Sequence, residues 1–358
     1  MATPEIIVSI FGILMLIPSI ASFSKFDEWW VRGWDFPRIQ IVFLSLVTLA
    51  FAVFIYSFQE TWHFVIIGLL ILSLIYQSVK IYPYTILARK QVLAFKGNDP
   101  DNLISILVSN VLTPNNHYDK LISHIKEYQP HVLLTLETDN EWEKALSVIE
   151  EDFPYTVKVP KDNLYGMHLY SKLPLEDIEV KYLISDEIPS IHGFVRLKSG
   201  PRVKIHCLHP KPPSPTEDDT STNRDAELLM VGKDCKTDHN SVLVFGDLND
   251  VAWSRTTRLF QKISGLLDPR RGRGFYNTFH TGYPLFRWPL DHLFHSNDFT
   301  VVEIHRLKSI GSDHFPIFVK LNYEPRAELF QEETEEADHE EKEWVDEKIE
   351  NGHPKEKV

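Results

Sequence analysis

Long apolar runs dominate the N-terminal part of the chain. Residues 6–23, 39–58 and 62–79 form three runs that contain no Asp, Glu, Lys or Arg. A membrane-spanning helix needs roughly 20 mainly apolar residues, and about 17 are tolerated. Buried helices of a globular core are the alternative, but three such runs so close together favour membrane spans. We therefore predict a membrane anchor of three transmembrane helices over residues 1–81, with the lipid bilayer as a partner.

Basic residues gather on one side of the predicted spans. The turn at residues 59–61 has no Lys or Arg, whereas the other side has seven, namely Lys25, Arg32, Arg38, Lys80, Arg89, Lys90 and Lys96. Lys and Arg near the ends of spans favour the cytoplasmic face. This distribution predicts an integral protein of the cell (inner) membrane with its long C-terminal part in the cytoplasm. Tryptophan and tyrosine residues cluster at the ends of the runs, as they do at membrane interfaces.

The pattern changes after a predicted linker at residues 82–101. Short apolar runs of strand length now alternate with segments such as residues 117–128, where Leu121, Ile122 and Ile125 recur at helical spacing. Strands with interleaved helices indicate an α/β sandwich, which we place at residues 102–323. The predicted strands are residues 104–108, 131–136, 202–208, 241–245 and 316–322, and a second helix is predicted over residues 223–231.

The charge is concentrated in the last part of the chain. Of the net charge of −13, the segment from Arg326 to Val358 contributes −8, which leaves −5 for the rest. We predict an acidic, disordered tail at residues 324–358, with a short amphipathic helix at 340–350 that docks a partner as the alternative. A mildly acidic body argues against tight binding of long nucleic acid. Cys207 and Cys235 are predicted to be two buried thiols, although one disulfide bond is the other reading.

Polar residues stand at the ends of the predicted strands. They are Asn110, Glu137, His209, the pair Asp247 and Asn249, and the pair Asp313 and His314. Each is ordinary by itself, because such residues are common in turns and caps, and Glu137 could cap a helix around residues 141–149. Together they indicate a site where strand ends converge. Asp247 and Asn249 are two positions apart, so in an extended backbone they would point to the same face.

Five short motifs give this set its specificity. They are Ser-Asn-Val at 109–111, Leu-Glu-Thr at 136–138, Gly-Asp-Leu-Asn at 246–249, Pro-Leu-Asp-His at 289–292 and Ser-Asp-His-Phe-Pro at 312–316. Their order resembles the endonuclease/exonuclease/phosphatase superfamily over residues 102–323, and most of all its bacterial membrane-linked members. The resemblance implies the DNase I-like four-layer α/β/β/α sandwich, and a divalent-metal-dependent hydrolase of phosphodiester or phosphomonoester bonds.

The resemblance also implies a role for each motif residue. Glu137 is similar to the metal-binding glutamate, Asn110 to the amide that orients the metal shell, and Asp313 to a second metal or hydrogen-bond contact. The implied cofactor is Mg²⁺, with Mn²⁺ as an alternative, since hard cations prefer oxygen ligands. The implied catalytic residues are His209, Asp247, Asn249, Asp291 and His314. The resemblance makes Asp247 the residue that aligns the water and Asp291 the partner of His314. The sequence leaves open whether Asp247 or His314 is the general base.

Two departures argue against assigning the chain to the best-known branches of the superfamily. Leu112 stands where abasic-site nucleases have an acidic residue, and Trp288 to His292 replaces the inositol phosphatase signature. The substrate therefore stays open among nucleic acid, nucleotide and phospholipid. A phospholipid- or headgroup-directed enzyme is the narrower alternative, because an anchor raises the local concentration of such substrates. A catalytically inactive membrane scaffold is the alternative of another class, although no protein partner is identifiable.

Other charged residues have weaker readings. Two interpretations of an arginine cluster are equally favoured, namely phosphate binding and a solvated loop: the cluster is Arg270, Arg271 and Arg273. Arg224 and Lys211 read as surface charges, and the Pro-rich segment 209–222 as a surface loop, with a lid over the site as the alternative. We assign no role to His192, His280, His295 or His305.

Overall fold

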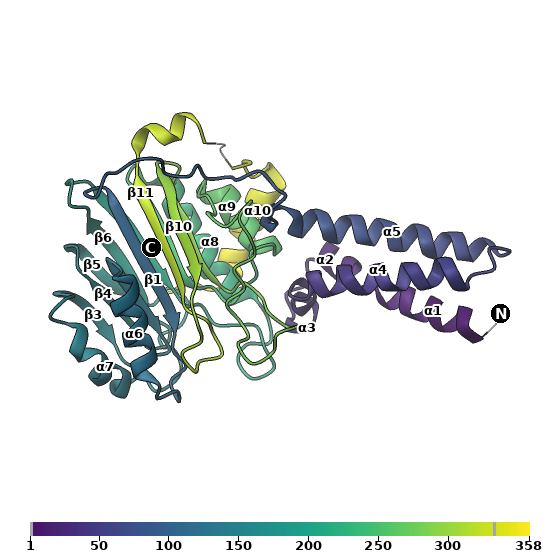
Figure 1. Ribbon diagram of the computed structural model, residues 1–358, viewed down its shortest axis with the longest axis horizontal. Coiled ribbons are helices and arrows are strands. Elements are labelled where there is room, and N and C mark those ends of the chain that lie inside the picture. Colours follow the sequence, from purple (N-terminus) through teal and green to yellow (C-terminus); the bar gives the residue numbers. More distant parts are fainter. Residues whose placement is uncertain (1–2, 332–333) are drawn as a thin grey trace.

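The computed structural model describes residues 3–331 and 334–358. A bundle of apolar helices projects from a body of two packed sheets, and the N-terminus lies at the far end of the bundle (Figure 1). Among the described residues, three helical segments are long and apolar enough to cross a membrane: Thr3–Phe23, Arg38–Ile55 and Thr61–Tyr84. They comprise α1 (Thr3–Leu14) with α2 (Ile17–Phe23), α4 (Arg38–Ile55), and α5 (Thr61–Ile81) with the 3-10 turn η2 (Tyr82–Tyr84).

Most side chains of these helices face outward. Only 22 to 28 % of each candidate span is buried within the protein. The inward faces carry the polar groups: Ser19 and Ser73 share a hydrogen bond of 2.7 Å, and Gln77 donates to Ser19 at 3.0 Å. Such hydrogen bonds hold helices together where lipid offers no hydrophobic driving force. This distribution of apolar and polar surface agrees with the length and composition that make the three segments candidate membrane spans.

The body contains two sheets that pack face to face. One has the strand order β10-β11-β1-β2-β4-β3, and the other has the order β5-β6-β7-β8-β9. The first sheet contains β1 (Leu103–Asn110), β2 (Val132–Leu136), β3 (Tyr155–Val159), β4 (Met167–Ser171), β10 (Phe299–Arg306) and β11 (Ile317–Tyr323). The second contains β5 (Leu175–Lys181), β6 (Ser190–Arg196), β7 (Arg202–Leu208), β8 (Ser241–Asp247) and β9 (Asp291–His295).

Helices cover the outer face of each sheet. The alternation of side chains along β8 shows why: Leu243 and Phe245 pack between the sheets, while Val242 and Val244 pack against the outer helices. Both faces of the strand are therefore buried, and the strand reads as a continuous apolar run. The four-layer α/β/β/α sandwich is confirmed. Its outer layers are α6 (Tyr118–Tyr128) and α7 (Asn140–Leu146) on one side, and α8 (Thr222–Thr237) and α9 (Arg255–Ser264) on the other.

The start of α7 corrects one reading of the sequence. Asp139, not Glu137, caps this helix, and its Oδ1 accepts a hydrogen bond of 2.9 Å from the backbone N–H of Trp142. A short 3-10 turn, η3 (Ser147–Ile149), extends the helix. Glu137 is therefore left available at the end of β2. The two cysteines are free and buried, as predicted.

The main prediction of a disordered tail is wrong for the segment that forms α10 (His339–Asn351), where the alternative of a short helix at 340–350 is the correct one. Asp338 and Glu341 cap this helix reciprocally, and Trp344 and Val345 pack on Leu229 of α8 and on α9. The acidic composition hid the helix because its few apolar residues find their partners on the body of the protein. Before it, η4 (Pro325–Leu329) follows β11, while α3 (Trp29–Arg32) and η1 (Gly33–Asp35) link the first two spans.

We expect Val345→Ala to lower the free energy of unfolding by about 2 kcal/mol, because it removes two buried methyl groups and leaves a cavity. Thermal unfolding of the purified full chain measures the effect. Glu347→Ala is the control, since Glu347 lies on the exposed side of α10. An exposed substitution of this kind should change stability by no more than roughly 0.5 kcal/mol. Equal melting temperatures for both variants would show that α10 does not pack on the body.

Candidate active site

The polar strand ends of both sheets meet at one cavity of about 420 Å³. β1 and β2 run parallel, and so do β7 and β8, so each pair delivers its C-terminal ends to the same edge. β9 and β11 run antiparallel to these pairs and contribute the residues at their starts. Six of the eight predicted site residues line the cavity: Glu137, His209, Asp247, Asn249, Asp313 and His314. Asn110 and Asp291 lie directly behind it, each 1 % exposed.

Asn110 connects the two sheets at the base of the site. Its amide nitrogen donates to Glu137 Oε1 at 2.7 Å and to Asp247 Oδ2 at 3.1 Å. Its amide oxygen accepts the backbone N–H of Leu112 at 3.2 Å. The amide therefore fixes the positions of both carboxylates while its own oxygen is already engaged. In this arrangement Asn110 acts on the cavity through Glu137 and Asp247.

The backbone around Glu137 is tightly constrained. Glu137 itself has φ of 59°, in the left-handed region that few non-glycine residues adopt. The next residue, Thr138, lies so close to β4 that a Cβ at Gly166 would come within 1.7 Å of the Thr138 carbonyl oxygen. Thr138 also accepts a hydrogen bond from Lys161 and donates one to Gly166. This close contact explains how a residue just beyond the strand end is held rigidly in place.

A buried histidine lies between two carboxylates on the opposite side of the cavity. His314 Nδ1 is 2.8 Å from Asp291 Oδ2, and His314 Nε2 is 3.5 Å from Asp247 Oδ2. Burial opposes protonation of the ring, but Asp247 and Asp291 outweigh it and raise the pKa of His314 to about 10. The ring is therefore a cation at neutral pH and can donate hydrogen bonds. Asp291 holds it in place, as the resemblance implied.

Two of the carboxylates that line the cavity have unusual proton affinities. Burial raises the pKa of Glu137 to about 7, although the hydrogen bond from Asn110 lowers it. Burial likewise raises the pKa of Asp247, against the effect of His314. Glu137 is therefore poised to bind a proton or a cation near neutral pH. Perturbed carboxyl groups in a cleft are typical of functional sites.

His209 differs from His314 in its charge. It lies at the end of β7, with Nε2 3.9 Å from Asp247 Oδ2, and its ring is 5.4 Å from that of Tyr165. Burial lowers the pKa of His209, so the ring is neutral at pH 7. Tyr165 donates to Glu217 at 2.9 Å, and both residues line the cavity. These two residues escaped the sequence analysis because neither belongs to a motif.

Asp247 and Asn249 reach the cavity by a turn and not by an extended strand. Asp247 Oδ1 accepts the backbone N–H of Asn249 at 3.0 Å, and Asn249 has φ of 50°. The Asn249 amide donates to the carbonyl of Pro210 at 3.0 Å, which links the turn to segment 209–222. The prediction that both residues share one face holds, but the expected geometry was wrong. A short Asx-type turn produces it.

Two arginines that the sequence placed at the surface or beside a phosphate are buried and paired within the protein. Arg224 is not a surface charge: it is 2 % exposed, and it donates to the backbone oxygen of Asn249 at 2.8 Å. Arg270 neither grips a phosphate nor lies in solvent: it is 1 % exposed, and it pairs with Asp268 at 2.7 Å. Arg270 also donates to the backbone oxygen of Asp291 at 3.2 Å. Both arginines support the backbone of a site residue from behind.

The anchor contributes one wall of the cavity. Phe36, just before α4, lines it beside Leu290, and its ring packs edge-on against Trp288 at 5.7 Å. Segment 209–222 forms another wall and is joined to the turn before α3 by a β-bridge between Glu28 and Thr220. The segment does cover part of the site, but it is tied to the anchor. Nothing in the sequence pointed to Phe36, because its neighbours in space are distant along the chain.

The donor atoms of the cavity fit a hard divalent cation. Two carboxylate oxygens are buried and have no hydrogen-bond partner among the described residues: Glu137 Oε2 at the cavity and Asp291 Oδ1 behind it. Three potential ligand atoms also lie within 4.8 Å of one another, one each from Asp247, Asp291 and His314. Both nitrogens of His314 already face carboxylates, so we regard the oxygens as the available donors. Buried carboxylate oxygens without partners are costly unless a cation or proton compensates them.

A two-sheet sandwich with this constellation at one edge defines a DNase I-like class of protein. The sequence profile of the Endonuclease/Exonuclease/phosphatase family matches residues 107–314, and the chain belongs to this family. Members of the family hydrolyse phosphoester bonds and generally use a divalent metal. The match begins after the three apolar helices, so membership of the family does not account for these helices. No curated protein sequence matches the chain.

Solved structures show the same fold at low sequence identity. TDP2 from D. rerio, complexed with a single-strand DNA product, is 17 % identical, with a TM-score of 0.51 over 62 % of this chain and 100 % of its own. The human Nocturnin catalytic domain with bound sulfate is 16 % identical, with a TM-score of 0.50 over 63 % and 96 %. The endonuclease/exonuclease/phosphatase from Bacteroides vulgatus is 13 % identical, with a TM-score of 0.50 over 62 % and 99 %.

The charge of His314 predicts a pH dependence of stability. Its pKa is about 10 in the folded protein against 6.5 for an unperturbed histidine, so its contribution is complete below pH 6.5 and is lost as the pH rises toward 10. With a chelator present, the melting temperature of the wild type should fall more steeply between pH 7 and 10 than that of His314→Gln. Parallel pH profiles for the two proteins would contradict a protonated His314.

Proposed function

We propose that this protein is a membrane-anchored, divalent-metal-dependent phosphohydrolase that cleaves phosphodiester or phosphomonoester bonds. The observation that carries the proposal is the position of Glu137, with its unpartnered carboxylate oxygen, across one cavity from the protonated His314. A phosphoester in that cavity would meet a cation-binding carboxylate and a cationic hydrogen-bond donor. These are the two groups that phosphoryl transfer needs to neutralise charge on the phosphoryl oxygens.

The proposed role of each site residue follows from the charge of its side chain. His314 is held as a cation by Asp291 and donates to a phosphoryl oxygen, so it is a poor proton acceptor. Asp247, whose pKa is raised by burial, aligns the attacking water and accepts its proton. Asn249 donates from the turn beyond Asp247, and the neutral His209, whose Nε2 lies 3.9 Å from Asp247 Oδ2, supplies a further hydrogen-bonding group to the substrate. This assigns the role of general base, which the sequence left open, to Asp247.

The proposed metal site uses Glu137 and Asp313, with Asn110 orienting Glu137. When bound there, Mg²⁺ or Mn²⁺ would supply positive charge to the phosphoryl oxygens and to the leaving group. The chain's own contribution is a carboxylate that is buried, constrained at its backbone and open toward the cavity. The charge of Asp313 contributes to the raised pKa of Glu137, which supports a site shared by these two acids.

Phosphoester hydrolysis by the purified full chain tests the catalytic residues. Asn249→Ala and His314→Ala should each lower turnover by about 10²–10³-fold, because each removes a donor that acts on transition-state charge. A panel of plasmid DNA, nucleotides and phospholipids with Mg²⁺ identifies the substrate class. Unchanged turnover in both variants would falsify the assignment.

Glu137→Gln tests the metal site. It should raise the Mg²⁺ concentration for half-maximal activity about tenfold or more, because it removes the buried anionic ligand. The control is Glu141→Gln, which changes the same residue type at the exposed start of α7. Calorimetry with Mg²⁺ and Mn²⁺ gives a second readout. A wild-type protein that binds neither ion and turns over no substrate would instead support the inactive scaffold.

A lipid or its headgroup is the substrate that the position of the cavity favours. Gln40 of α4 donates to the carbonyl of Leu285 at 2.6 Å, which joins the anchor to the loop between Phe279 and Trp288. The tip of this loop exposes Tyr283, Leu285 and Phe286 at 61, 78 and 52 %. An apolar tip beside a membrane span is suited to the lipid interface. The cavity would then open close to the surface of the bilayer.

Leu285→Asp tests this narrower proposal. It should lower turnover of a phosphoester embedded in vesicles several-fold and leave turnover of a soluble chromogenic phosphodiester unchanged, because only membrane engagement of the loop is altered. Val148→Asp provides the matched control, since Val148 is 68 % exposed on η3, in the outer layer next to α7. Rapid nicking of plasmid DNA, with no activity on vesicles, would exclude the lipid version.

A further inference from the structure

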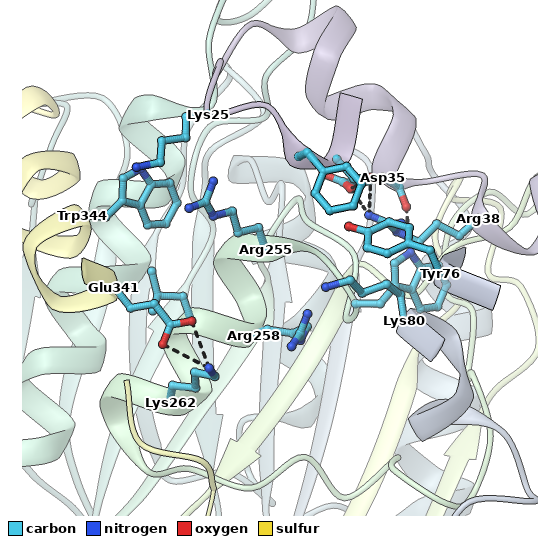
Figure 2. Close-up of a pocket in the computed structure, with 14 residues that line it drawn as sticks. Lys25, Asp35, Arg38, Tyr76, Lys80, Arg255, Arg258, Lys262, Glu341 and Trp344 are labelled. Carbon is cyan, nitrogen blue, oxygen red and sulfur yellow. Dashed lines mark hydrogen bonds and ion pairs between the residues drawn. The ribbon is translucent and has the colours of Figure 1, made fainter. Parts of the chain in front are cut away.

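A second cavity lies between the anchor and the outer helices of the body. Its volume is about 350 Å³, and its walls come from α2, α4 and α5 on one side and from α9 and α10 on the other. Figure 2 shows its charged side chains distributed around one central space. None of the predicted catalytic or metal residues lines it. It is therefore separate from the candidate active site.

Positive charge dominates this cavity. Six cationic side chains line it against two carboxylates, an excess of four. The chain as a whole has a net charge of −13, so the surplus is a local feature and not a reflection of composition. The six are Lys25, Arg38, Lys80, Arg255, Arg258 and Lys262.

The two carboxylates already have partners. Asp35 pairs with Arg38 and with Arg32, the latter at 3.5 Å. Glu341 accepts from Lys262 at 3.0 and 3.1 Å (Figure 2). Neither acid is left to neutralise the remaining cations.

Four cations of the cavity have no ion-pair partner among the described residues: Lys25, Lys80, Arg255 and Arg258. Two of them stack on aromatic rings, with Arg255 4.3 Å from the ring centre of Trp344 and Lys80 5.2 Å from that of Tyr76. These contacts hold the guanidinium of Arg255 and the ammonium of Lys80 at the cavity without neutralising their charges. Burial and the nearby Arg32 lower the pKa of Arg255, so the surroundings disfavour the positive charge of this guanidinium. An anion would relieve this repulsion.

The cavity lies at the end of the candidate spans. Lys80 is in the last turn of α5, and Phe23, which also lines the cavity, ends α2. Phospholipid headgroups occupy this level of a membrane, and basic residues next to spans attract the anionic ones. A neighbouring cavity of about 470 Å³ shares Lys80, Arg258 and Lys262 and adds Arg271. The positive surface therefore continues around the end of α5.

We propose that this cavity binds the phosphoryl headgroup of an anionic phospholipid as a structural or regulatory ligand. The unpaired cations supply charge-assisted hydrogen bonds to phosphate oxygens, and the guanidinium groups of Arg255 and Arg258 match their geometry. The apolar side chains of Phe23 and Tyr76 adjoin the lipid-facing surface of the anchor, where the acyl chains would lie. A soluble phosphate offers the same headgroup chemistry but lacks this apolar part.

Lipid retention by the full chain tests the proposal. Protein is released from nanodiscs with equal amounts of phosphatidylglycerol and phosphatidylcholine, and bound lipid is counted by native mass spectrometry. The wild type should retain phosphatidylglycerol selectively. Arg255→Gln with Arg258→Gln should weaken retention about 25-fold, at about fivefold for each cation removed near an anionic headgroup. The control is Lys120→Gln with Lys126→Gln, the same loss of charge on the exposed face of α6.

Two further arms separate the alternatives. His314→Ala changes the active site and should retain the lipid as the wild type does, so loss of retention in that variant alone would place the lipid in the catalytic cavity and overturn the proposal. Inorganic phosphate at millimolar concentration should not displace the lipid. Equal retention of both lipids by the wild type, or displacement by phosphate, also overturns the proposal, whether or not the arginine variants fold.

Discussion

The buried contact of His314 with Asp291 and Asp247 is the interaction on which the site depends. A cationic imidazole excluded from water would be unstable by itself, and the two carboxylates would repel each other without it. Asp291 begins β9, Asp247 ends β8, and His314 precedes β11, which belongs to the other sheet. The cluster therefore fixes how the two sheets meet at the edge that holds the candidate site. Asn110 adds a neutral link from β1 to Asp247 and Glu137.

The turn between the first two spans connects the anchor to the body. Asp27 pairs with Lys348 of α10 and accepts from Thr222 at the start of α8. Trp253, which follows the Asp247 turn, donates to the backbone oxygen of Asp35 at 2.7 Å. Thr222 ends segment 209–222, which lines the cavity, and Trp253 follows the Asp247 turn, so the anchor and the candidate site are packed together. An orientation of the anchor in a membrane would therefore fix the direction in which the cavity opens.

Much of the fold could be predicted because it depends on local periodicity. The strands β1, β2, β7, β8 and β11 are mainly apolar runs, and a polar site residue ends or follows each of the first four. Arg224 and Arg270 could not be placed in this way, because their burial depends on carboxylates and backbone oxygens, several of which come from other segments. The helix α10 was only the alternative prediction for the same reason: Trp344 and Val345 are isolated in the sequence, and only α8 and α9 complete their environment. Phe36 belongs to the anchor in the sequence but to the active-site wall in the structure.

Consecutive residues of the anchor face the two cavities. Asp35 lines the cationic cavity and Phe36 lines the candidate active site, so a change in the packing of η1 would alter both cavities. A bound headgroup that neutralised Arg255 and Arg258 would strengthen the packing of α9 against the anchor by removing repulsion among the cations. The same helix follows the turn that carries Asp247, Asn249 and the buried Asp250, whose Oδ2 accepts from Ser254 at 2.5 Å. The proposed lipid site would thus stabilise, from outside, the loop that carries Asp247 and Asn249.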